Sequence, residues 1–314
     1  MIRREVSPRG AKKKKTFQES ASSLKLLHQP GSSLAKVQQR APFFSSFAPL
    51  FFAAFPPGAG QVLKTTLRET FLPCRKLLIM TVQEIMAELK AMGSETTRNT
   101  LINHGGPANQ FGVRVGDLKK IQKKVKKNYE LSLELYDTGI SDAQYLAGLI
   151  ADEKRMTKKD LQHWADTAVW HMQSEYTVPW IAAESNYGWE LALKWIDSKK
   201  ESIQSSGWAT LASLAAIKND DELDLKEWKN LLKRVEKDIH SSANKVRYVM
   251  NSFVIATGCY ITALSGEAQK TARAIGKVSV NMGNTACKVL FAPDYIQKVI
   301  DKGYLGKKKK MARC

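Results

Sequence analysis

From Thr81 onward, apolar residues recur at the spacing of a helix that buries one face. The first such stripe consists of Val82, Ile85, Met86 and Leu89. Just before it, Thr81 and Glu84 match the capping-box pattern that begins many helices, in which each of the two side chains satisfies a backbone N–H of the other residue. The sequence therefore predicts that ordered helical structure begins close to residue 80.

The same pattern continues along the rest of the chain. We expect Gly93 to end the first helix, and the N-caps of later helices to be Ser94, Asp117, Ser141 and Thr157. Further helices are predicted at 168–183, 188–198, 202–218, 225–240, 243–257, 265–277 and 293–302. No strand-like alternation or Asn-Gly hairpin separates them. Short joins between such helices indicate antiparallel pairs, so we predict an all-α, HEAT-like helical-repeat solenoid with a concave binding face.

Composition divides the chain into three parts. Residues 1–80 carry 14 Lys or Arg against 3 acidic residues, and a Phe- and Pro-rich patch lies at 41–57. Its prolines make this patch unsuited to cross a bilayer as one helix. We interpret 1–79 as a low-complexity basic extension, disordered or a start-site artefact. A helical-repeat domain over 80–305 and a flexible basic tail over 306–314 are expected to follow.

The charge balance indicates an anionic partner. The 314 residues include 49 Lys or Arg and 30 Asp or Glu, which gives a formal net charge of +19. Nucleic acid is the first candidate and an anionic membrane surface the second. One helix face concentrates this charge within an arc of about 160°. Its lysines are predicted to contact phosphate without acidic neighbours to offset them, and they are Lys119, Lys120, Lys123, Lys124, Lys126 and Lys127.

Other basic and aromatic residues are weaker binding candidates. Lys245 and Arg247 stand at the start of a late helix, and the 307–310 lysine run could add non-specific attraction. All seven tryptophans lie between residues 164 and 228. Those at 189 and 195 sit among apolar neighbours and are expected in the core. Trp170 and Trp208 have more polar neighbours and are predicted to be exposed, where they could stack on nucleic acid.

Several other chemistries lack support in the sequence. His163 and His171 are not at the spacing of a helical metal pair, and no Cys or acidic cluster joins them. The four cysteines form no paired motif, which favours reduced thiols in a cytoplasmic protein. Nucleotide-binding glycine loops and a hydrolase nucleophile motif are absent. We therefore expect no metal and no small-molecule cofactor.

Five stretches, in order, resemble the DNA alkylation repair family of HEAT-like repeat DNA glycosylases. The resemblance runs from about residue 80 to about residue 300 and is most specific in the first half, and the stretches are 88–93, 109–121, 133–139, 142–151 and 291–296. It implies a C-shaped helical solenoid whose basic concave face holds duplex DNA. It also implies, for active members, excision of positively charged alkylated purines.

The resemblance also implies an active site that this chain has changed. Family members carry a Trp, an Asp four positions later and an Arg on a later helix. Trp170 matches the Trp, but the position four residues on is Ser174, and 201–217 contains no Arg or Lys. Trp208 lies on that later helix and could keep an aromatic contact. A hydroxyl carries no charge to stabilise a developing cation, so excision is expected to be lost or reduced.

The first interpretation is thus a monomeric DNA-binding protein of the cytoplasm, nucleoid-associated in a bacterium. Its partner would be double-stranded DNA, alkylated or structured, bound by the lysines, Trp170, Ser174, Trp208 and the Lys245–Arg247 pair. One alternative is an active alkylpurine DNA glycosylase of base excision repair in which Asp166 or Glu175 supplies the carboxylate. A second alternative is a protein-interaction scaffold, which predicts weak DNA affinity with little salt dependence.

Overall fold

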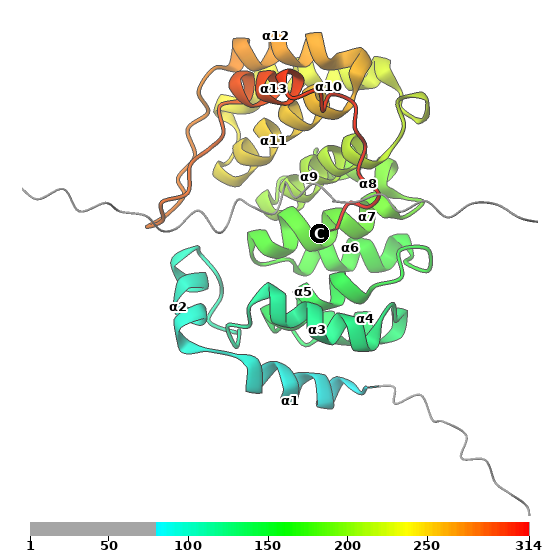
Figure 1. Cartoon of the computed structure of the whole chain (residues 1–314), viewed down its shortest axis with the longest axis vertical. Coiled ribbons are helices and arrows are strands. Elements are labelled where there is room, and N and C mark those ends of the chain that lie inside the picture. The colour runs from blue at the N-terminus through cyan, green and yellow to red at the C-terminus, as the bar shows by residue number, and fades with distance from the viewer. Residues whose placement is uncertain (1–79, 314) are drawn as a thin grey trace, which may run out of the picture. The chain divides into compact units, whose positions relative to one another are not determined.

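The structure, a computed structural model, describes residues 80–313, so the extension expected over 1–79 lies outside the described residues. Within 80–313 there are thirteen α-helices and no strand (Figure 1). The all-α prediction is confirmed. The helices are α1 (Val82–Met92), α2 (Glu95–Asn103), α3 (Val115–Val125), α4 (Tyr129–Asp137), α5 (Ser141–Ile150), α6 (Lys158–Thr167), α7 (Val178–Glu184), α8 (Gly188–Trp195), α9 (Glu201–Ile217), α10 (Leu225–Asp238), α11 (Asn244–Tyr260), α12 (Ser265–Ile275) and α13 (Ala292–Asp301).

Local capping signals begin several of these helices. Thr81 caps α1 in a complete capping box, and Thr157 does the same for α6. The hydroxyl of Ser94 accepts a hydrogen bond from the backbone N–H of Thr97 at the start of α2. Gly93 follows the last residue of α1, as expected. These predictions are confirmed because each depends on residues only three or four positions apart.

Two predicted caps are wrong. α3 begins at Val115, before Asp117, whose carboxylate accepts instead from Arg114 (3.0 Å) and Lys120 (2.8 Å). Ser141 is the first residue of α5 rather than its N-cap. In both helices the chain adopts helical geometry one to three residues earlier than the side-chain pattern indicated.

The helices stack in two rows. α3, α5, α7, α9, α11 and α13 form the inner row, in which α5 contacts α3 and α7, and α9 contacts both α7 and α11. α4, α6, α8 and α12 pack on the inner helices as an outer row, and α10 packs on α12 and α11. Figure 1 shows this succession from α1 to α12 along the long axis of the view. Consecutive antiparallel pairs therefore bury one continuous core, as in a helical-repeat protein.

Tryptophans dominate that core. The rings of Trp164 and Tyr136 stack at 4.2 Å, and the rings of Trp228 and Phe253 stack at 5.2 Å. Trp195 is fully buried, and Trp189 packs against Trp228 at 5.9 Å. The prediction that the tryptophans at 189 and 195 belong to the core is confirmed. These pairs join neighbouring helices of the stack, α4 to α6, α8 to α10 and α10 to α11.

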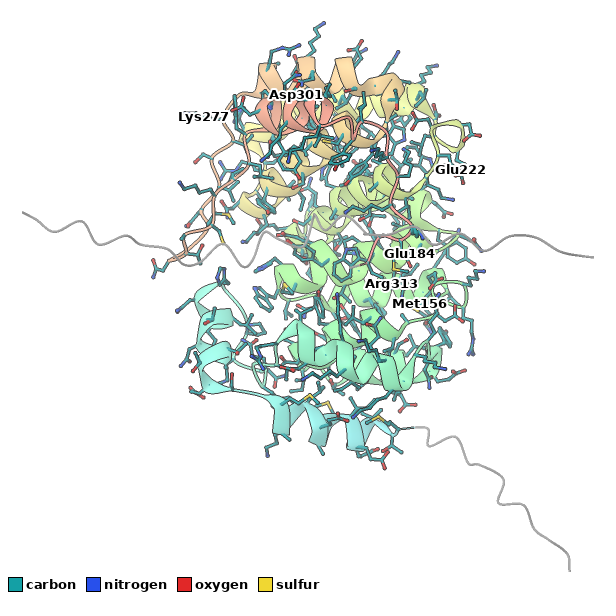
Figure 2. All side chains as sticks on the ribbon, in the orientation of Figure 1. Met156, Glu184, Glu222, Lys277, Asp301 and Arg313 are labelled. Atoms are coloured by element: carbon teal, nitrogen blue, oxygen red, sulfur yellow. The ribbon has the colours of Figure 1, made fainter. Side chains whose placement is uncertain are left out.

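The segment after α13 is docked on the stack, so the expectation of a flexible tail is wrong. It runs from α13 toward α7 (Figure 1), and the backbone N–H of Lys309 donates to the carbonyl of Ala216 at 2.7 Å. At its end, the guanidinium of Arg313 is 5% exposed and bridges Glu153 (2.5 Å) and Glu184 (2.6 Å). Figure 2 shows Arg313 beside Glu184. The tail thus ties the end of the described chain to the C-terminal ends of α9, α7 and α5.

A long excursion between α12 and α13 reaches back across the stack. Residues 276–291 descend from α12 toward α2 in Figure 1. The side chain of Asn244, at the start of α11, accepts from the backbone N–H of Asn281 (2.7 Å) and donates to its carbonyl (2.9 Å). Farther along, Sγ of Cys287 lies 3.9 Å from Nδ1 of His104 at the end of α2. The excursion therefore borders the N-terminal end of α11.

Within 80–313, no single helix is both long and apolar enough to cross a membrane. The bent pair formed by α11 and the following segment to Ile275 passes by length and composition only, and its two parts meet at 114°. Most of α11 is buried inside the stack, which explains its apolar character.

Candidate nucleic-acid interface

The inner row contains one irregular turn, directly after Trp170. Met172–Thr177 is π-helical and continues as α7. Such turns are rare and frequently lie at functional sites. The indole of Trp170 is 7% exposed, so the prediction that this side chain lies at the surface is wrong. Its Nε1 donates to the carbonyl of His104 (3.3 Å), and its ring meets that of His171 edge-on at 4.6 Å. Trp170 therefore lies between the start of the inner helix and the end of α2.

Two titratable side chains at this turn, buried Glu175 and half-buried His171, are uncharged at neutral pH. Burial raises the pKa of Glu175 to about 8, with the charge of Lys245 opposing and that of Glu201 adding to the shift. Burial lowers the pKa of His171 to about 4, and the charges of Lys245 and His104 lower it further. At pH 7 the first is therefore a carboxylic acid and the second an uncharged imidazole.

The N-terminal turn of α11 brings positive charge to this turn. Lys245 and Arg247 lie there, no acidic residue occupies the first turn, and Ala243 provides no side-chain cap. One backbone N–H, that of Lys245, donates to the carboxylate of Glu201 at 2.7 Å. The partial positive charge of a helix N-terminus adds to the charge of the two side chains. Together they form a setting suited to a phosphate.

Buried polar atoms without a partner gather on the same elements. Within the described residues, those on the π-helical turn, α9 and α11 include His171 Nδ1, Glu175 Oε1, Ser205 Oγ, Arg247 Nε and Asn251 Oδ1. The π-helical turn packs on α9, and α9 packs on α11. Such atoms are uncommon in folded proteins and each calls for an explanation. This polar cluster, with Trp170 and Lys245, is the candidate site.

The predicted lysine face differs from its sequence-based description. α3 ends at Val125, and Lys126 adopts a positive φ of 62°, so Lys126 and Lys127 leave the helix. Lys120, Lys124 and Lys127 form ion pairs with Asp117 (2.8 Å), Glu88 (2.6 Å) and Glu153 (2.5 Å). The expectation that no acidic residue offsets this charge is therefore wrong. Lys119, Lys123 and Lys126 have no carboxylate partner among residues 80–313.

The lysine face and the polar cluster are separate surfaces. Lys123, Lys126 and Lys127 line an open groove together with Glu184, the last residue of α7. Trp170 precedes the opposite end of the same continuous helix. At about 1.5 Å per residue, the two ends of that helix are roughly 15–20 Å apart. Contact of the lysines with phosphate remains a prediction, but these lysines and Trp170 do not form one site.

The predictions that Trp208 and Ser174 contact DNA need correction. Trp208 is fully buried, with its ring 5.2 Å from that of Phe253, so the prediction that it lies at the surface is wrong. α9 is buried along most of its length, and the small and polar neighbours of Trp208 reflect close helix packing rather than exposure. Ser174 is 4% exposed, and its hydroxyl donates to the carbonyl of Trp170 at 3.3 Å. Neither side chain is placed to contact DNA.

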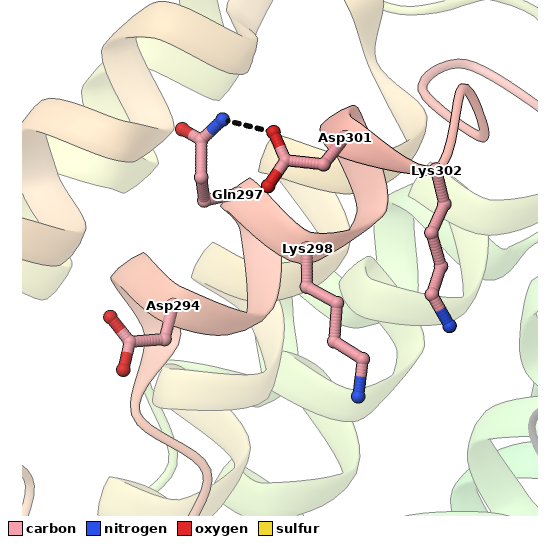
Figure 3. Close-up of a pocket in the computed structure, with 5 residues that line it drawn as sticks. All are labelled: Asp294, Gln297, Lys298, Asp301 and Lys302. Atoms are coloured by element: carbon pink, nitrogen blue, oxygen red, sulfur yellow. Dashed lines mark hydrogen bonds between the residues drawn. The ribbon is translucent and has the colours of Figure 1, made fainter.

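Other candidate chemistry lies away from this cluster or has no support. Asp166 is exposed on α6 of the outer row and accepts from Gln162 (2.9 Å). Over residues 80–313, no three His, Cys, Asp or Glu side chains are grouped as metal ligands. A depression of about 330 Å³ lies along α13 (Figure 3), and in its lining the side chain of Gln297 donates a hydrogen bond to Asp301 at 2.8 Å. Its five lining residues all belong to one helix and its cap, and none belongs to the polar cluster.

The stacked antiparallel pairs of helices are the architecture of a HEAT-like repeat protein. A family model described as DNA alkylation repair enzyme matches residues 85–264. The chain therefore belongs to the DNA alkylation repair family, and the resemblance seen in its sequence is confirmed.

Known relatives extend over most of the chain. It is 33% identical over 226 residues to uncharacterized protein Lin0241 of Listeria innocua and to uncharacterized protein Lmo0209 of Listeria monocytogenes, covering 70% of this chain and 97% of each relative. It is 37% identical, with a TM-score of 0.70, to a solved structure from a new family of proteins related to the HEAT-like repeat DNA glycosylases with affinity for branched DNA structures. That match covers 75% of this chain and 100% of the solved one.

Proposed function

We propose that this protein binds duplex and branched DNA at the inner-row polar cluster without excising bases. The observation that carries the proposal is the cationic N-terminal turn of α11 beside Trp170. Lys245, Arg247 and the backbone N–H groups of a helix start are the donors that commonly hold DNA phosphates. The affinity of the solved relative for branched DNA supports this choice of partner.

Contacts of this kind read the backbone rather than the base sequence. Each ammonium or guanidinium group that reaches a phosphate releases a counterion, so affinity falls steeply with salt. The indole of Trp170 is 7% exposed and contacts the ring of His171, whose pKa the charge of Lys245 lowers. A protein built this way recognises the geometry of its DNA rather than a particular base.

The absence of base excision follows from charge. Departure of an alkylated purine leaves an oxocarbenium-like sugar, which a nearby carboxylate stabilises. Glu175 keeps its proton at pH 7 because burial raises its pKa to about 8. The hydroxyl of Ser174 is neutral and already bonded to a backbone carbonyl, and Asp166 lies on the outer row. The carboxylate of Glu201, which also lies at this cluster, accepts the backbone N–H of Lys245 at 2.7 Å. Among residues 80–313, neither the position four residues after Trp170 nor the turn that follows it therefore offers the ionised carboxylate that the glycosylase alternative requires.

A salt titration of DNA binding tests the proposed interface. In K245A/R247A, the slope of log affinity against log salt should fall by about 2, because two phosphate contacts are lost. The matched control is K229A/K233A, which removes two exposed cations of α10 and should leave the slope unchanged. An equal response of the two variants would contradict the interface. Weak wild-type binding with little salt dependence would favour the protein scaffold instead.

An excision assay tests the second half of the proposal. Duplex DNA containing N7-methylguanine should show no base release above the uncatalysed rate over a range of pH. Release that disappears in Glu175→Gln or in Asp166→Asn would establish the active glycosylase and refute the proposal. Intact binding of the same DNA serves as the control for a folded, competent protein.

A further inference from the structure

A second cationic surface lies at the other end of the inner helices. It is an open groove of about 710 Å³, formed where α3, α7 and α9 end and where the docked tail crosses them. The end of α3 contributes Lys123 and Lys126 to its lining, the end of α9 contributes Lys218, and the tail contributes Lys310. Arg313 and the backbone contact of Lys309 with Ala216 hold the tail at this groove.

The charge of this groove is positive after its internal pairs are counted. Six Lys or Arg and three Glu side chains line it. Glu222 pairs with Lys218 (3.0 Å), while Glu153 and Glu184 are held by Arg313. The side chains leave an excess of three positive charges in the groove. The C-terminal ends of three helices each add roughly −0.5 charge, which offsets only part of that excess. Three ammonium groups have no carboxylate partner in the described chain, and they belong to Lys123, Lys126 and Lys310.

This groove is distinct from the polar cluster at Trp170. The two surfaces lie at opposite ends of the helix that continues from the π-helical turn into α7, roughly 15–20 Å apart. A separation of that order is comparable to the width of one DNA duplex. Two cationic surfaces so placed can each contact a different arm of one branched molecule.

We infer that the groove lined by Lys123, Lys126 and Lys310 holds the phosphate backbone of a second arm of branched DNA while the polar cluster holds the first. This inference rests on the proposed function, which supplies the first arm. Unpaired ammonium groups in an open groove suit a phosphate backbone, which needs several point contacts and no deep pocket. Joining two moderate contacts through one rigid ligand makes the second contact intramolecular and raises the affinity for the branched form.

The test compares a four-way junction with a linear duplex of the same arm sequence. The groove variant is K123E/K126E/K310E, and the control is K229E/K233E/K237E, which makes the same change of charge on exposed positions of α10. We expect the groove variant to bind the junction about tenfold more weakly or worse, with the salt slope reduced by about 2–3, and to bind linear duplex as the control does. If charge reversal prevents folding, the neutral K123Q/K126Q/K310Q provides the same comparison.

The outcomes separate the two proposals. A wild-type protein that binds neither DNA defeats the proposed function itself. If the wild type prefers the junction and the groove variant keeps that preference, the second-arm inference alone is overturned. It is also overturned if the groove variant loses the same factor for junction and duplex, because the groove would then belong to the first-arm surface. In a competition experiment with the wild type, we expect linear DNA to displace the junction only when it is present in large excess.

Discussion

Arg313 offers the sharpest test of how the C-terminal segment contributes to the fold. Its guanidinium is 5% exposed and contacts two carboxylates, Glu153 at 2.5 Å and Glu184 at 2.6 Å. It also donates to the carbonyl of Ala151 at 2.9 Å. Arg313→Ala removes all of these bonds at once. The perturbation leaves two largely buried carboxylates without their shared cation.

The expected loss can be estimated from these contacts. Removing one partner of a buried ion pair costs about 3–5 kcal/mol, because the remaining charge stays buried without compensation. Glu153 keeps the ion pair with Lys127 (2.5 Å), and Glu184 keeps backbone N–H donors of the tail if the tail stays docked. These remaining partners favour the lower end, so we expect a loss of about 3 kcal/mol in the free energy of unfolding. For a domain of this size, that corresponds to a Tm lower by roughly 6–12 °C.

Urea unfolding of the full chain, followed by helical circular dichroism, measures this loss. Lys310→Ala, an exposed neighbour in the same tail, is the control and should change stability by less than about 0.5 kcal/mol. Arg313→Lys should recover only part of the loss, because an ammonium group cannot match the planar guanidinium that bridges two carboxylates. A midpoint for Arg313→Ala equal to that of Lys310→Ala would refute the argument that the tail is anchored by this charge.

Two further predictions concern the buried interior. The pKa of Glu175 is raised from 4.5 to about 8, so between those pH values the folded chain retains a proton that the unfolded chain has lost, and stability should fall as pH rises from about 4.5 to about 8. Thermal melts of Glu175→Gln should lose that decline, which is roughly 5 kcal/mol over the whole window at about 1.4 kcal/mol per pH unit, and a pH profile unchanged by the substitution would show that Glu175 is ionised in the fold. A Cβ on Gly207 would lie 2.7 Å from the backbone nitrogen of Ile196, so Gly207→Ala should destabilise the fold by about 1–3 kcal/mol in urea unfolding. Gly266→Ala, where a Cβ meets nothing within 4 Å, should be neutral or stabilising, and similar effects at both glycines would contradict the packing.

Local signals in the sequence predicted much of the fold. Thr81 and Thr157 form complete capping boxes because every partner lies within three residues. The helix predicted at 202–218 likewise matches α9 to within one residue at each end. The end of α3 was missed because Lys126 adopts a positive φ that a lysine rarely takes, and no glycine marks the position. Periodicity reports burial of a face, but it does not report where the backbone turns.

The candidate site was harder to predict because it depends on distant contacts. Trp208 has Gly, Ser and Ala neighbours in the sequence, which suggested exposure, yet these small residues allow α8 and α11 to approach α9 closely. Two of the three acidic partners of the lysine face lie on α1 and after α5, and Arg313 meets Glu153 across 160 positions. The burial that keeps Glu175 protonated arises from packing among three helices. None of these relations has a local signature.

The docked tail changes how the stack should unfold. A repeat array whose units contact only their neighbours behaves as a one-dimensional system and can open from either end. Here the tail donates hydrogen bonds to α11, α9, α7 and the end of α5, so it joins units that are not adjacent in the array. Opening any of these units exposes the contacts of several others. Amide hydrogens from α5 to α11 are therefore expected to exchange together in a single cooperative event, whereas α1 and α2, beyond the reach of the tail, exchange first.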